Sequence, residues 1–151
     1  MIIFVAQYLF VLPILVFTWL ILTIQYKSRI ALVVSGISGG IVCLLLAKLG
    51  NHYIIDPRPF IRDGVTALFK SSIDNGFPSD HTLLSFFLSF LIVRFSRNIG
   101  IVLIVISLLI GWARVYSGVH HFYDVLGSLV ISVLGVTVGM AFQKAVKINE
   151  K

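Results

Sequence analysis

Long apolar stretches alternate with short polar segments along the whole chain. Five stretches approach the length of a membrane span: residues 2–24, 30–50, 81–95, 99–115 and 123–142. A helix needs about 20 apolar residues to cross a bilayer, and the third and fourth stretches are short because polar residues occupy their ends. The pattern predicts an all-α fold, a polytopic membrane helix bundle with about five transmembrane helices, in a single integral-membrane domain over residues 1–151.

Proline and glycine positions add detail to this bundle. The first stretch has no basic segment before it and no small-residue cleavage site, which predicts a retained helix and not a signal peptide. Pro13 predicts a kink near the middle of that helix. Small residues recur in the second and fifth stretches: Gly36, Gly39, Gly40, Gly135 and Gly139. They predict close helix packing within the chain, which we favour over a dimer face.

The longest connection, residues 51–78, carries a weaker helical pattern. Its apolar side chains Ile61, Val65, Leu68 and Phe69 would share one face of a helix. This spacing predicts an interfacial helix near residues 61–70, lying on the membrane surface. A disordered loop is the alternative, because Gly64 weakens the helical pattern.

Composition agrees with a membrane protein, since 58% of the residues are hydrophobic and 12% are charged, with a mean hydropathy of +1.03. The net charge of +6 would suit nucleic acid, but its placement argues against that partner. If five helices alternate, one side receives seven cations: Lys27, Arg29, Arg94, Arg97, Lys144, Lys147 and Lys151. The other side receives Lys48, Arg58, Arg62, Lys70 and Arg114. The positive-inside rule then predicts a multi-pass protein of the cell membrane with its C-terminus in the cytoplasm.

The segment GWARVYSGVHHFYDV, residues 111–125, places ionisable groups between two apolar stretches on the outer side. His120 and Asp124 are four residues apart and would share a helix face. A carboxylate there can orient an imidazole for nucleophilic or base chemistry. His121 could compete for the same carboxylate, and helical spacing does not choose between the two histidines. A turn at Gly118 would bring Arg114 back toward them.

Two further segments on the same side suit an anion. Ser79 follows Pro78 and is a candidate N-cap of the third long helix. The free N–H groups and positive dipole of that helix start favour a phosphate. Arg58 lies between two prolines in DPRPF and offers a guanidinium that can bind an anion through two hydrogen bonds. Ionisable groups beside membrane spans are functional candidates, so we expect one site on the extracytoplasmic face.

At these residues the chain resembles the type-2 phosphatidic acid phosphatase superfamily. Arg114, His120 and Asp124 fit its third signature, PSDH fits the second with Asp80 in place of the usual Gly, and DPRPF fits the end of the first. The Asp80 and PRPF forms look most like the bacterial undecaprenyl-diphosphate phosphatases of that superfamily. Two features depart from it. The family lysine position holds Asn51, with Lys48 one turn earlier, and the family core usually has six helices.

The resemblance implies a role for each matching residue. His120 would be the nucleophile that forms a phosphohistidine, oriented by Asp124, and His81 would be the general acid for the leaving group. Phosphate oxygens would be held by Arg58, Arg114 and Ser79, with Lys48 as a further candidate. No metal and no cofactor are expected, because arginines and helix N–H groups would meet the phosphoryl charge.

These features favour an enzyme that hydrolyses a lipid phosphate within the membrane. The proposed reaction converts an isoprenoid diphosphate, undecaprenyl diphosphate, to its monophosphate. The runner-up substrates are phosphatidic acid and phosphatidylglycerol phosphate. A metal-dependent hydrolase would instead use His81, His120, Asp80 and Asp124 as ligands, beside two poorly placed arginines. A small transporter would carry its charges at mid-membrane on broken helices, not at helix ends.

Overall fold

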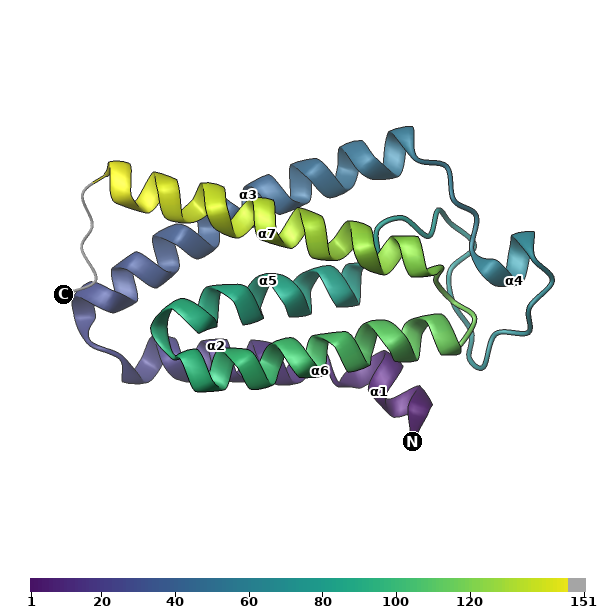
Figure 1. Ribbon diagram of the computed structural model, residues 1–151, viewed down its shortest axis with the longest axis horizontal. Coiled ribbons are helices and arrows are strands. Elements are labelled where there is room, and N and C mark those ends of the chain that lie inside the picture. Colours follow the sequence, from purple (N-terminus) through teal and green to yellow (C-terminus); the bar gives the residue numbers. More distant parts are fainter. Residues whose placement is uncertain (147–151) are drawn as a thin grey trace.

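The computed structural model describes residues 1–146, which form seven helices and no strand. The helices are α1 (Ile2–Tyr8), α2 (Val11–Thr23), α3 (Tyr26–Tyr53), α4 (Pro59–Arg62), α5 (Asp80–Phe95), α6 (Arg97–Tyr116) and α7 (Phe122–Ala145). The long helices run side by side as a bundle, with α4 and the long connection at one end (Figure 1). The all-α membrane bundle predicted from the sequence is therefore confirmed.

Three helices, α3, α6 and α7, are long and apolar enough to cross a membrane, and the bent pair α1–α2 makes a fourth if it counts as one span. The third predicted span, residues 81–95, corresponds to α5, which has 16 residues, or about 24 Å at 1.5 Å per residue. It lies in the middle of the bundle (Figure 1) and packs against α6 and α7. Most of α5 is thus covered by its neighbours and not by lipid.

The kink predicted from Pro13 is present, one turn before the proline. The axes of α1 and α2 differ by 46°. Proline has no N–H to give the carbonyl four residues earlier, which here belongs to Leu9. Leu12 N–H instead donates to Leu9 O at 3.0 Å, and the helix breaks between Tyr8 and Val11. The break directs α1 toward the loop end of the bundle.

Helices α3 and α7 approach each other through their glycines. A Cβ atom added at Gly39 would lie 2.6 Å from the carbonyl oxygen of Gly135, and one added at Gly139 would collide with Ser35 O. The glycines therefore allow backbone-to-backbone packing within one chain, as predicted. The core beside them is apolar and includes the fully buried Leu32, Leu91 and Ile92.

The prediction of an interfacial helix over residues 61–70 is wrong. The helix there, α4, ends at Arg62, and the chain continues without helix to Ser79. Gly64 has φ of +68°, a left-handed conformation that ends a right-handed helix. The segment instead pairs with the turn after α6, where Leu68 N–H donates to Ser117 O at 3.1 Å.

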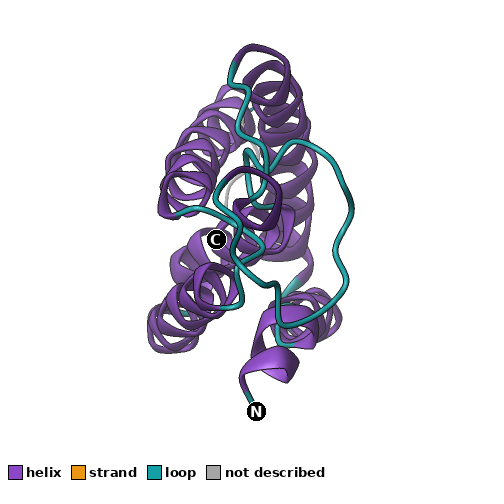
Figure 2. Cartoon of the chain, turned by 90° about the vertical axis from the view of Figure 1, so that its right-hand side faces the viewer, coloured by secondary structure: helices purple, strands orange, loops and turns teal. Residues whose placement is uncertain are grey.

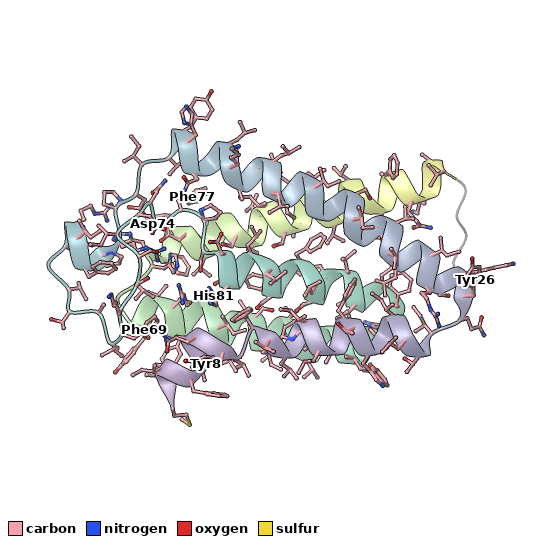
Figure 3. All side chains as sticks on the ribbon, turned by 180° about the vertical axis from the view of Figure 1, so that it is seen from behind. Tyr8, Tyr26, Phe69, Asp74, Phe77 and His81 are labelled. Atoms are coloured by element: carbon pink, nitrogen blue, oxygen red, sulfur yellow. The ribbon has the colours of Figure 1, made fainter. Side chains whose placement is uncertain are left out.

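The candidate site residues and the cations assigned to the cytoplasmic side lie at opposite ends of the bundle, as predicted. Figure 3 shows Tyr8, Phe69, Asp74, Phe77 and His81 at one end of the bundle and Tyr26 at the other. The connections holding Arg58 and His120 belong to the first end, and Lys27 and Arg29 begin α3 at the second. Lys147 and Lys151, predicted as part of a cytoplasmic tail, lie outside the described residues.

Candidate active site

Segments far apart in the sequence converge at the loop end of the bundle (Figure 2). They enclose a cavity of about 360 Å³ between α1, the connection after α4, the start of α5 and the turn before α7. Its lining residues are Gln7, Tyr8, Arg58, Phe69, Lys70, Ser71, Ser72, Asp74, Asp80, His81, Arg114 and His120. Four of the predicted site residues thus share one cavity.

The geometry distinguishes the two adjacent histidines. His120 Nδ1 lies 3.1 Å from Asp124 Oδ2, and both side chains are buried. The His121 backbone N–H donates to the same carboxylate oxygen at 2.9 Å, while the His121 ring faces Asp56 and Asp63. The ring that Asp124 orients is therefore that of His120. With the proton on Nδ1, the Nε2 atom keeps its lone pair.

Two buried arginines converge on that lone pair. Arg58 NH1 lies 3.1 Å from His120 Nε2, and Arg114 NH2 lies 3.0 Å from it. Both guanidinium groups can donate to the unprotonated nitrogen. The turn predicted at Gly118 is present, with φ of +69°, and it returns the chain from Arg114 to His120.

Each arginine is held by further contacts. Arg58 donates through Nε to Asp74 Oδ1 at 2.7 Å and through NH1 to Val119 O at 3.0 Å. Arg114 donates through NH1 to Ala6 O at 3.2 Å, and its guanidinium carbon lies 5.7 Å from the centroid of the Phe69 ring. The two guanidinium groups are therefore fixed before any substrate binds, which lowers the entropy cost of binding an anion.

The electrostatics favour a neutral imidazole at His120. Burial lowers the pKa of His120, and the nearby Arg114 and Arg58 lower it further, against the opposing effect of Asp124. A lowered pKa means that the ring stays unprotonated at neutral pH. The site therefore presents an unprotonated imidazole nitrogen between two cations, an arrangement that suits attack on the phosphorus of an anionic phosphate once the phosphate oxygens take over the arginine hydrogen bonds.

Of the two candidate site residues near the start of α5, His81 lines the cavity and Ser79 does not. The His81 ring packs edge-on against Phe10 with centroids 4.4 Å apart. Ser79 occupies the predicted N-cap position of α5 without a side-chain capping bond, because its hydroxyl pairs with Thr82 Oγ1 at 3.0 Å. Ser79 is fully buried and is not among the lining residues, so the structure does not bring its side chain to the cavity.

Lys48 also stays outside the cavity. It lies on an exposed face of α3 and is not among the lining residues. Asn51, at the position of the family lysine, donates through Nδ2 to Phe77 O at 2.9 Å. Asn51 thus fixes the loop before α5 and does not face the candidate nucleophile.

Sequence reasoning missed Asp74 and the contribution of α1. Burial acts to raise the pKa of Asp74, but hydrogen bonds from Arg58 and Ser72 outweigh it and lower the pKa. Asp74 is therefore the ionised partner of Arg58. A single Asp in a long loop carries no spacing signal, and Ala6 acts through a backbone carbonyl that any residue possesses.

The metal-hydrolase hypothesis named four ligands that the structure does not group together. Among the described residues, the donors close enough to share a cation belong to Asp56, His121 and Asp124, within 4.8 Å of one another. His121 Nδ1 and Asp56 Oδ2 already face each other at 2.9 Å, and Arg62 donates to Asp56 Oδ1 at 2.7 Å. This set lies beside the arginine-lined cavity and shares Asp124 alone with the predicted ligands.

Comparison with known proteins identifies the family. The model of the PAP2 superfamily matches residues 28–148. The chain is 33% identical over 132 residues to undecaprenyl-diphosphatase BcrC of Bacillus subtilis, covering 87% of this chain and 68% of that protein. It is 34% identical over 134 residues to the bacitracin transport permease protein BcrC of Bacillus licheniformis, covering 87% and 64%. It is 35% identical over 96 residues to the putative undecaprenyl-diphosphatase YbjG of Escherichia coli, covering 62% and 48%.

Two solved structures share the fold. LpxE of Aquifex aeolicus matches with a TM-score of 0.70 and 21% identity, over 93% of this chain and 85% of that one. A PAP2-type phosphatidylglycerolphosphate phosphatase of Bacillus subtilis matches with a TM-score of 0.54 and 18% identity, over 95% and 98%. The family relatives indicate a lipid phosphatase, a hydrolase of a multi-pass membrane class. On the family match and these identities, the chain belongs to the PAP2 superfamily.

Proposed function

We propose that this lipid phosphatase hydrolyses an isoprenoid diphosphate, most specifically undecaprenyl diphosphate to undecaprenyl phosphate, through a phosphohistidine at His120. The observation that carries the proposal is the convergence of Arg58 and Arg114 on His120 Nε2, at 3.1 and 3.0 Å. Two forked cations in front of a nucleophilic nitrogen form a receptor for a phosphoryl group.

The reaction proceeds in two displacements. The His120 Nε2 lone pair attacks the terminal phosphorus, and the bond from phosphorus to the bridging oxygen breaks. His81 gives a proton to that oxygen, and the lipid monophosphate leaves. Water then attacks the phosphohistidine, with His81 as base, and releases inorganic phosphate and free His120. Asp124 stabilises the imidazolium character that develops on His120, and the arginines stabilise the charge on the phosphoryl oxygens.

No metal or cofactor enters these steps. Arg58 and Arg114 supply two fixed positive charges at the phosphoryl position, which is the role a divalent cation has in other phosphoryl-transfer sites. Phosphate release that persists in excess chelator supports this mechanism. Loss of release on chelation would favour a cation at Asp56, His121 and Asp124.

The position of the cavity suits a lipid. It lies among helix ends, so an isoprenoid tail can remain in the bilayer while the diphosphate reaches the arginines. The opposite end of the bundle carries the positively charged side chains of Lys27, Arg29, Arg94 and Arg97. By the positive-inside rule, we place the active site on the extracytoplasmic face and the C-terminus in the cytoplasm.

The substrate proposal rests on two observations. Two of the named relatives are undecaprenyl-diphosphatases, one of them putative, at 33% and 35% identity. The charged residues that line the cavity are the cations Arg58, Lys70 and Arg114 and the carboxylates Asp74 and Asp80, an excess of positive charge that suits a diphosphate, which carries more negative charge than a monoester. The glycerolipid phosphates are the competing substrates.

The test is phosphate release by purified protein in mixed micelles with excess chelator. The kcat/KM values for undecaprenyl diphosphate, undecaprenyl phosphate and phosphatidic acid are measured side by side. The proposal predicts that the diphosphate gives the largest value. A preference for phosphatidic acid would transfer the proposal to glycerolipids, and no release from any of the three would contradict the phosphatase function itself.

A further inference from the structure

Four polar side chains beside the cavity, those of Asp56, Arg62, Asp63 and His121, form a closed ring of contacts, and Arg62 NH2 also lies 2.9 Å from His121 Nε2 across it. Arg62 donates through Nε to Asp63 Oδ1 at 2.9 Å and through NH1 to Asp56 Oδ1 at 2.7 Å. His121 completes the ring, with Nδ1 2.9 Å from Asp56 Oδ2 and Nε2 2.8 Å from Asp63 Oδ2. Each carboxylate thus contacts Arg62 with one oxygen and His121 with the other. The roles described so far for His120, Asp124, Arg58, Arg114 and His81 do not use this ring.

The ring joins the two backbone segments that carry the reacting groups. Asp56 precedes Arg58 by two residues, and Arg58 is the N-cap of the helix that ends at Arg62. The Arg62 N–H donates to Arg58 O at 3.0 Å. On the other side, His121 directly follows His120 and is the N-cap of α7. The ring therefore links the turn that presents Arg58 to the turn that presents His120.

His121 also connects the ring to the carboxylate that orients the nucleophile. Its backbone N–H donates to Asp124 Oδ2 at 2.9 Å, the oxygen that faces His120 Nδ1. The other oxygen, Asp124 Oδ1, is buried and has no hydrogen-bond partner among the described residues. The hydrogen bonds from His120 and His121 thus meet at one oxygen of Asp124, and a shift of His121 would move that oxygen relative to His120.

The two halves of the ring differ in exposure. The side chains of Asp56 and His121 are each 13% exposed, whereas those of Arg62 and Asp63 are 51% and 41% exposed. Exposed ion pairs are screened by solvent and contribute little to stability. Burial and the nearby Asp124 raise the pKa of Asp56, while His121 and Arg62 oppose that rise. The largely buried Asp56–His121 pair is thus the part of the ring that can fix the positions of its neighbours.

We propose that Asp56 and His121 are positioning residues. They keep Arg58 and Asp124 in place around the His120 ring, so that His120 Nε2 is aligned for in-line phosphoryl transfer. This inference rests on the proposed phosphatase function. Neither residue touches the phosphoryl group in this scheme. Both act through the turns they join, so their loss is expected to disturb alignment more than substrate binding, which Arg58 and Arg114 still provide.

The experiment measures kcat and KM separately for Asp56→Asn, His121→Gln and the double variant, with undecaprenyl diphosphate in mixed micelles. Misplacement of a reacting group by about 1 Å can cost about 100-fold in rate. We therefore expect each single variant to lower kcat by about 10- to 100-fold, with KM changed by less than about threefold. The double variant should be little slower than the slower single variant, because the two residues act as one unit.

The control is His52→Gln, a histidine whose ring packs against Tyr53 at the end of α3 and which does not line the cavity. Its kcat should equal that of the wild type. If Asp56→Asn fails to fold, His121→Gln carries the test by itself, with the same expected fall in kcat and the same limit on the change in KM.

Three results would overturn the inference: unchanged kcat in the folded ring variants, a rise in KM with unchanged kcat, or single effects that multiply fully in the double variant. These outcomes leave the phosphatase function intact as long as wild type and His52→Gln release phosphate. Failure of the wild type to release phosphate from any lipid phosphate would overturn the proposed function, and this inference with it.

Discussion

Arg58 and His120 are 62 residues apart in the sequence, yet Arg58 NH1 lies 3.1 Å from His120 Nε2. The contact joins a proline-flanked arginine to the histidine that Asp124 orients, and both side chains are buried. Isolated arginines near membrane surfaces commonly extend toward lipid headgroups. Arg58 instead faces into the cavity, where Asp74 holds it.

Arg58→Lys is expected to lower kcat/KM by about 100- to 1,000-fold, because a lysine ammonium lacks the planar fork that meets both Asp74 and the phosphoryl group. Lys48→Gln serves as the matched control. Lys48 was a candidate phosphate ligand from the sequence, but it lies on the exposed face of α3. We expect it to retain wild-type kcat/KM. A large loss in Lys48→Gln would show that Lys48 reaches the substrate.

The pH dependence of kcat/KM should report the lowered pKa of His120. A histidine with a lowered pKa stays neutral, and hence nucleophilic, to a lower pH than an ordinary histidine. The acid limb should therefore fall below pH ~6.5, the usual histidine value. Asp124 opposes the lowering, so the residual activity of Asp124→Asn should show an acid limb at still lower pH. A shift to higher pH would contradict this electrostatic account.

Gly39→Ala should destabilise the bundle, because the new Cβ would lie 2.6 Å from the backbone oxygen of Gly135. Overpacking of this kind costs about 1–3 kcal/mol. Gly36→Ala, on the same helix, is the control, since its nearest neighbour is the Phe17 ring at 3.4 Å. The melting temperature in detergent should fall for Gly39→Ala and stay near the wild-type value for Gly36→Ala. Equal melting temperatures would contradict the α3–α7 packing.

Cysteine labelling tests the orientation in the membrane. In a Cys43→Ala background, Thr66→Cys should react with an impermeant thiol reagent added outside intact cells. Gln25→Cys, at the opposite end of the bundle, should react after permeabilisation. Both positions are exposed in the structure. The reverse pattern would place the cavity in the cytoplasm and overturn the charge argument.

Apolar patterning predicted the helices well and their ends poorly. The fifth stretch was expected at residues 123–142 and is helical over Phe122–Ala145, and the second was expected at residues 30–50 and is helical over Tyr26–Tyr53. Polar residues at helix ends satisfy the backbone without adding to an apolar run, so the pattern stops early. The interfacial helix failed for a local reason, because Gly64 adopts φ of +68°.

The candidate site was also predicted in part. Spacing and motifs predicted that one site would contain Arg58, Arg114, His81 and His120, and in the structure all four line one cavity. Spacing alone could not choose between His120 and His121, because the choice depends on which ring turns toward Asp124. Ser79 was expected to cap α5, but Thr82 competes for its hydroxyl. The carbonyl of Ala6, which accepts from Arg114, is a backbone group and leaves no sequence signal.

The most direct test of the account is to trap the phospho-enzyme and locate the phosphate. Wild-type protein is mixed with undecaprenyl diphosphate labelled in its terminal phosphate, quenched within a turnover and mapped by mass spectrometry. The account predicts an acid-labile, base-stable phosphate on His120 that His120→Ala abolishes together with turnover. His121→Gln should still form it, more slowly. Phosphate on His121, a base-labile acyl phosphate, or turnover that survives in His120→Ala would contradict it.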